Sequence, residues 1–93
     1  MSLSRAEIAT PSGEHLIDRL CKHWAPEFEV EHSAQEARIA FASGTCLMRA
    51  DEETLAVAIE TLEEEHLDTL EGVVERQLMQ VAGDEALVII WEN

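Results

Sequence analysis

The segment EARIAFASGTCLMRADEETLAVAIE, residues 36–60, decides the fold. Apolar residues alternate with polar or small ones in three runs, 36–42, 45–50 and 54–60, and a period of two is typical of β-strands. Ser43-Gly44 and the acidic stretch 51–53 separate the runs and predict turns. The run 27–32 alternates in the same way, so we expect four strands in an antiparallel meander.

Residues upstream of the meander predict a strand over 4–10 and a helix over 10–24. Thr10 or Ser12 can cap this helix, and Pro26 ends it because the residue before a proline is pushed out of the helical region. Apolar residues recur at helical spacing and predict a buried stripe of Leu16, Ile17, Leu20, Cys21 and Trp24.

Residues downstream of the meander predict a second helix over 62–82 and a last strand over 85–92. Thr61 and Glu64 have the spacing of a capping box, and Gly83 is placed to end the helix. Its expected buried stripe is Leu67, Leu70, Val74, Leu78 and Val81. The strand EALVIIWE is apolar on both sides, so we expect it to be central or covered on both faces.

Together these elements predict an α+β fold, in the order strand, helix, four strands, helix, strand, within one domain of residues 1–93. About six strands would form an antiparallel sheet, with both helices packed on one face. The other face would then be open, small and apolar, carrying Ala40, Ala56, Ala58, one side of strand 45–50, and Val88 or Ile90. Since such a face is usually covered, we expect a homodimer through it, or otherwise a bound ligand.

Charge restricts the classes of partner. Twenty acidic residues stand against six basic ones, a formal net charge of −14. Such a surface repels phosphate backbones and anionic membranes, so neither nucleic acid nor membrane is an expected partner. No apolar run approaches a transmembrane length and the N-terminus has no secretory pattern, which predicts a cytoplasmic protein with its two cysteines as thiols.

The stretch LCKHW, residues 20–24, invites a metal or catalytic interpretation that helical geometry opposes. Cys21 and His23 lie two positions apart, about 200° around a helix, so they cannot share one ion or act as nucleophile and base. No phosphate loop or hydrolase motif is present. Glu63 and His66 in the EEEH stretch are interpreted as a solvated acidic cap. We therefore expect no catalytic residue, resident metal or cofactor.

The order of several short motifs resembles one bacterial family. HLIDRLCKHW, ARIAFASGTCLMRAD and LEGVVERQLMQVA followed by LVIIWEN resemble domain of unknown function 2218 over nearly the whole chain. The resemblance implies a small α+β protein with an accessory part in iron handling, and a siderophore-interacting reductase as partner. The family pattern has a histidine after Val-Val-Glu-Arg, where this chain has Gln77. Any two-histidine site with His23 would therefore be broken here.

The expected function is a non-enzymatic accessory or binding module, linked to iron or siderophore metabolism through the resemblance. The candidate ligand-binding residues are His23, Cys46, Trp24 and Arg49. One alternative is a metal-binding or haem-type ligand-binding protein using His23 and Cys46. A second alternative is a purely structural homodimerisation domain.

Overall fold

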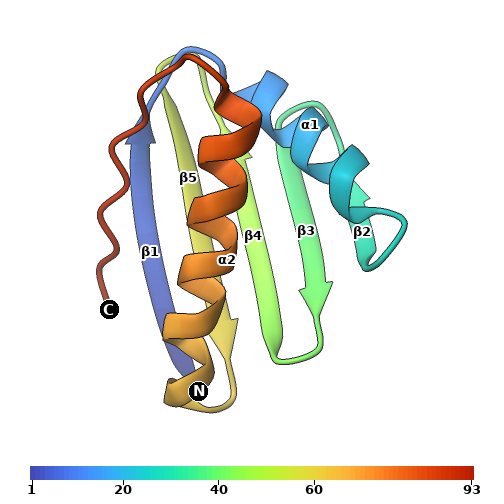
Figure 1. Ribbon diagram of the computed structural model, residues 1–93, viewed down its shortest axis with the longest axis vertical. Coiled ribbons are helices and arrows are strands. Elements are labelled where there is room, and N and C mark those ends of the chain that lie inside the picture. The colour runs from blue at the N-terminus through green and yellow to red at the C-terminus, as the bar shows by residue number, and fades with distance from the viewer.

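The computed structural model describes all residues, 1–93, as a five-stranded antiparallel sheet with two helices (Figure 1). The elements in chain order are β1 (Ser2–Ala9), α1 (Gly13–Trp24), β2 (Glu29–His32), β3 (Glu36–Phe41), β4 (Gly44–Ala50), β5 (Thr54–Thr61) and α2 (Glu64–Ala82). The predicted α+β class and the meander of β2 to β5 are confirmed.

The order of strands across the sheet is β1-β5-β4-β3-β2. The first strand of the chain therefore pairs with the last, in a register that sets Ser2 opposite Thr61 and Ala9 opposite Thr54. Helix α1 carries the chain from β1 to β2, which are the two opposite edges of the sheet (Figure 1). This arrangement brings the N-terminal strand into the same surface as the meander.

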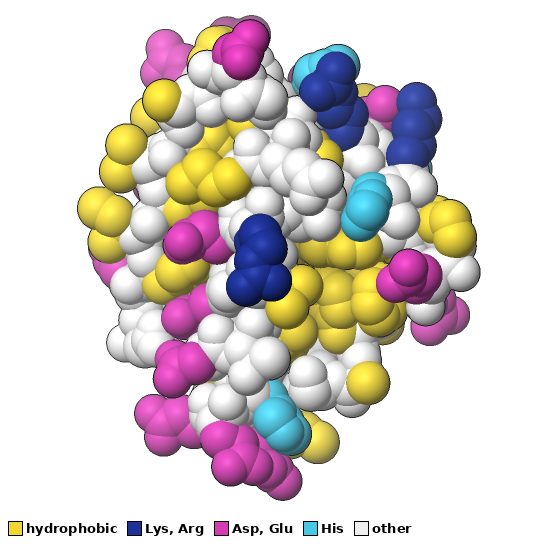
Figure 2. Space-filling view, viewed as in Figure 1, with side chains coloured by type: hydrophobic (Ala, Val, Ile, Leu, Met, Phe, Trp, Pro, Cys, Tyr) yellow, Lys and Arg dark blue, Asp and Glu magenta, His cyan; other side chains and the backbone are white.

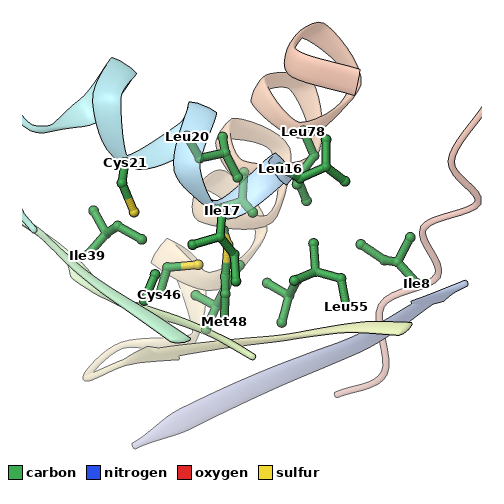
Figure 3. Packing of buried hydrophobic residues seen from close by; sticks show 14 of the residues in the cluster. Ile8, Leu16, Ile17, Leu20, Cys21, Ile39, Cys46, Met48, Leu55 and Leu78 are labelled. Carbon is green, nitrogen blue, oxygen red and sulfur yellow. The ribbon is translucent and has the colours of Figure 1, made fainter. Parts of the chain in front are cut away.

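Both helices lie on one face of the sheet, where they bury a single core (Figure 3). The labelled side chains of α1, α2 and the strands point toward one another in the space between the helices and the sheet. Fully buried members include Ile17 from α1, Val74 from α2, and Ile39 and Ile59 from the sheet. Strands β1, β3, β4 and β5 contribute alternate residues to this core, whereas β2 contributes only the partly buried Val30.

Helix α1 begins without the predicted side-chain cap. Ser12 occupies the N-cap position but makes no capping hydrogen bond. Its own N–H donates to Thr10 Oγ1 at 3.0 Å, and the Thr10 hydroxyl donates to the carboxylate of Glu85. Thr10 therefore ties the start of α1 to the segment after α2, a contact far apart in sequence.

Helix α2 begins two residues later than the capping box predicted. Its N-cap is Glu63, and the Thr61 hydroxyl donates to the Glu63 carbonyl at 2.8 Å instead of accepting from the helix. The predicted capping box with Glu64 does not form, because Thr61 completes β5 and is buried there. Gly83 does end the helix, with a left-handed φ of 63° that glycine adopts at little cost.

The segment 85–92 is the main difference from the predicted fold, because it is not a strand of the sheet. It runs beside β1 (Figure 1) and forms one isolated bridge, in which Arg5 and Glu92 exchange backbone hydrogen bonds of 2.9 and 2.7 Å. Leu87 is buried, but Val88 and Ile90 are 70% and 68% exposed. The sheet therefore has five strands, and this segment is covered on one side only.

Candidate ligand-binding face

The face of the sheet opposite the helices is open and hollow. Figure 2 looks onto the helix-covered side, where acidic side chains gather around the lower half; the open face lies on the other side of the molecule. A hollow of about 1050 Å³ lies over the open face, bordered at one edge by Ile90 and Glu92 of the C-terminal segment. This volume is slightly above the usual range of small-molecule sites, about 300–1,000 Å³.

Small side chains on β5 form the floor of the hollow. Ala56 and Ala58 lie next to each other on the open face of this strand, between the side chains of β1 and β4. The neighbouring strands contribute Leu3 and Leu47. Because β1 and β4 are two strand spacings apart, about 10 Å, the alanines leave a trough between two taller walls.

Three arginines surround this floor. In the register of the sheet, Arg5 of β1 lies opposite Ala58, and Arg49 of β4 lies opposite Ala56. Arg38 of β3 lies opposite Leu47, which makes it a diagonal neighbour of Arg49. All three are exposed. Half of the six basic residues in an acidic chain therefore line one hollow.

None of these three guanidinium groups is engaged within the protein. The one arginine side chain that donates a hydrogen bond is Arg19, which contacts the Val81 carbonyl at 2.8 Å. The ion pair of the molecule joins Lys22 to Asp18 within α1, and no arginine takes part in one. The arginines of the hollow thus keep their donors available for a ligand.

Carboxylates complete the surroundings of the hollow. Glu36 lies opposite Arg49 and Glu31 lies opposite Arg38 in the strand register, yet neither pair approaches to 4.0 Å. Five glutamates line the hollow in all, a quarter of the acidic residues of the chain, against half of the basic ones. Relative to the composition of the whole chain, basic residues are therefore enriched around the hollow, although glutamates outnumber arginines there.

The structure separates the four candidate ligand-binding residues. Arg49 lies on the open face. Cys46 is fully buried on the helix side of the sheet, and His23 is exposed near the end of α1. Trp24 is buried, with its ring 5.2 Å from that of Phe41 in an edge-to-face contact. His23 and Cys46 therefore do not share one accessible site, and Trp24 is part of the core.

The two cysteines face the same core and are free thiols (Figure 3). Burial raises the pKa of Cys46 to about 12, with a further contribution from the nearby Cys21. Burial, and then the charge of Asp18, also raises the pKa of Cys21. A thiol with a raised pKa is mostly protonated at neutral pH and is a poor nucleophile or metal ligand.

A second cluster lies at the start of α2. Ligand atoms of Glu63, Glu65 and His66 come within 4.8 Å of one another, and both glutamates are exposed. The His66 Nε2 to Glu65 Oε1 distance is 3.9 Å. An exposed acidic turn of this kind is common on protein surfaces, and nothing buried points into it.

Sequence reasoning identified Arg49 but missed Arg5 and Arg38, although a signal was available. Each of the three arginines stands between two buried neighbours in a strand, as in Ala37-Arg38-Ile39. In a strand such a residue must point to the face opposite the core. The pattern therefore assigned all three to the open face, while their grouping around one floor depended on the pairing of β1 with β5.

Comparisons with known proteins agree with this architecture. The family model described as "Uncharacterized protein conserved in bacteria (DUF2218)" matches residues 5–92. The NMR structure of PA4090 from Pseudomonas aeruginosa is similar, with a TM-score of 0.83 and 30% sequence identity, over 99% of this chain and 96% of that one. No curated protein matches the chain. Neither helix is long and apolar enough to cross a membrane. The chain thus belongs to the bacterial DUF2218 family.

Proposed function

We propose that this protein is a non-enzymatic binding module that holds a small ligand on the open face of its sheet. The observation that carries the proposal is the hollow itself, with a floor of Ala56 and Ala58 and three arginines that have no partner in the chain. Small-molecule sites are concave and largely apolar, with a few positioned polar groups. The side chains of Leu3, Leu47, Ala56, Ala58 and Ile90 provide the apolar part of this hollow, and the charged side chains around them provide the polar groups.

A binding role is favoured over catalysis by the character of the side chains in the hollow. Catalysis of group transfer usually needs a nucleophile with its base, or an acid and base of different pKa. The hollow contains arginines, glutamates and apolar side chains, with no cysteine, histidine or serine. Arginine binds anions well and stays protonated, which suits recognition better than proton transfer.

Packing of a second copy on the same face is the other candidate. Val88 and Ile90 are largely exposed, and Leu47 is 36% exposed. Exposed apolar side chains of this size favour a protein interface. Charged side chains such as Arg5, Glu7 and Arg49 interrupt the apolar ones on this face, however, so we favour a small ligand over a second copy. The link to iron handling implied by the family resemblance remains a prediction.

The proposal can be tested by filling the floor. We expect the uncharged fluorescent probe N-phenyl-1-naphthylamine to bind the native chain and to bind Ala58→Trp at least about tenfold more weakly, because the indole occupies the trough. Ala25→Trp, at an exposed position after α1, should bind like the native chain. Equal binding by Ala58→Trp and the native chain would contradict the proposal.

Sedimentation of the native chain at the probe concentration provides the second test. A monomer, or a dimer that still binds the probe, agrees with a ligand face. A dimer that excludes the probe would assign the face to a second copy and overturn the ligand proposal.

A further inference from the structure

We infer that the hollow selects ligands that combine a flat apolar body with a single anionic group, and that Arg49 and Arg38 bind this group. This inference rests on the proposed function, because it names the ligand class of the same face. It uses two separate properties of the hollow, which are the apolar floor and the placement of the charges around it.

The apolar body is favoured by the shape and composition of the floor. Ala56 and Ala58 are half-buried and expose only methyl groups and backbone between the walls. Leu47 lies beside Ala58 on β4, and Ile90 borders the hollow from the C-terminal segment. A flat ring system placed on the alanines would contact Leu47, the cross-strand neighbour of Ala58, and remove exposed apolar surface from water.

The anionic group is favoured by the two arginines at one wall. Arg38 and Arg49 are diagonal neighbours on adjacent strands, where Cβ atoms lie about 7–8 Å apart. Guanidinium groups on such positions can reach one carboxylate or sulfonate between them, and charge-assisted hydrogen bonds of this kind are about twice as strong as neutral ones. Neither guanidinium group makes a hydrogen bond or an ion pair within the protein, although Glu36 and Glu31 are their cross-strand neighbours.

The five glutamates limit the charge that the ligand can carry. Glu7 lies opposite Ala56 across from Arg49, and Glu60 follows Ala58 on the floor strand. Their field, added to the net charge of −14, repels a second anionic group placed over the floor. The hollow therefore suits a monoanion and disfavours phosphate esters with two charges or tricarboxylates.

The test compares two probes with the same ring skeleton. 1-Anilinonaphthalene-8-sulfonate carries one sulfonate, and N-phenyl-1-naphthylamine carries none. We expect the sulfonate probe to bind the native chain more tightly than the uncharged probe. Arg49→Gln and Arg38→Gln should each weaken the sulfonate probe about tenfold and leave the uncharged probe within about twofold. Lys22→Gln removes the same charge from an exposed position on α1 and should change neither affinity by more than about twofold.

Three outcomes would overturn the inference. Equal affinity for both probes, or equal effects of Arg49→Gln and Lys22→Gln, would remove the anionic group from the ligand class. If inorganic phosphate displaced the sulfonate probe at a concentration equal to that of the probe, the ligand would not need an apolar body. In each case Ala58→Trp still reports on the proposed function, because weaker binding of the uncharged probe by that variant shows the floor to be in use. Melting curves of all variants verify that they are folded.

Discussion

Cys46 shows how position converts a reactive residue type into an inert one. Its side chain is fully buried between β4 and the helices, where a thiolate would lose its hydration without gaining a partner. The two thiols therefore behave as small apolar side chains of the core. The predicted buried stripe of α1 correctly includes Cys21. Cys46 was a candidate ligand-binding residue, but its side chain lies on the helix-covered side of β4, where a ligand cannot reach it.

The raised pKa of Cys46 makes stability fall at alkaline pH. Because the folded pKa of about 12 lies above the ordinary value of 9.0, the thiol contributes its full stabilisation below pH 9 and loses it as pH rises toward 12. Between pH 8 and pH 10.5 the loss should be about 2 kcal/mol. Urea unfolding under reducing conditions measures it, and Cys46→Ala should lack this part of the pH dependence. An identical dependence in both proteins would contradict the assignment.

Gly44 is a residue at which packing excludes any side chain. A Cβ at this position would clash with the Glu60 carbonyl and lie 2.8 Å from Thr61 Cγ2 and 2.9 Å from Leu70 Cδ1. Gly44→Ala should therefore lower the free energy of unfolding by about 1–3 kcal/mol. Gly72→Ala is the matched control, because nothing lies within 4 Å of its added methyl; as a helix-interior glycine it should stabilise by about 0.5–1 kcal/mol. Similar effects at both positions in chemical unfolding would refute this explanation.

At the scale of elements, the residue pattern within a segment predicted the strands and the helix ends that depend on neighbouring residues. The alternation in residues 36–60 gave β3, β4 and β5 to within one residue or so, and Gly83 ended α2 as expected. The capping box failed because the Thr61 side chain serves the end of β5. The pairing of β1 with β5 could not be read from either strand alone, since it joins residues that lie 45 to 59 positions apart.

The C-terminal segment was mispredicted because side-chain pattern does not report backbone pairing. Leu87, Ile89 and Trp91 pack toward the core, and Trp91 Nε1 donates to Glu75 at 3.1 Å. This alternation is that of a strand, and the sequence showed it. Membership of the sheet depends instead on backbone hydrogen bonds to the outer edge of β1. The C-terminal segment forms these bonds only between Glu92 and Arg5.

Amide hydrogen exchange should display this partial docking. The N–H groups of residues 86–91 have no backbone hydrogen bond, whereas those of Arg5 and Glu92 are paired. We expect the first group to exchange at rates near those of an unfolded chain, and the amide of Val57 in β5 to be strongly protected. Glu92 should be intermediate, because a single bridge at the end of the chain opens readily. Strong protection of Val88 and Ile90 would mean that a complete sixth strand forms.

At the scale of the whole molecule, two helices on one side of a five-stranded sheet leave the other side without a covering layer. The sequence predicted this open face and its alanines, and it predicted the strongly acidic charge. It described the face as small and apolar, however, and so underestimated its charged side chains. Arg5, Arg38 and Arg49 come together only through the complete strand order.

Chemical-shift mapping would show directly whether ligand binds on the open face of the sheet. The ¹⁵N-labelled native chain would be titrated with 1-anilinonaphthalene-8-sulfonate while the amide signals are followed. We expect the largest changes at Leu47, Arg49, Ala56 and Ala58, with the outer surfaces of α1 and α2 nearly unchanged. Changes confined to the helices, or to the acidic turn at Glu63–His66, would contradict binding on the open face.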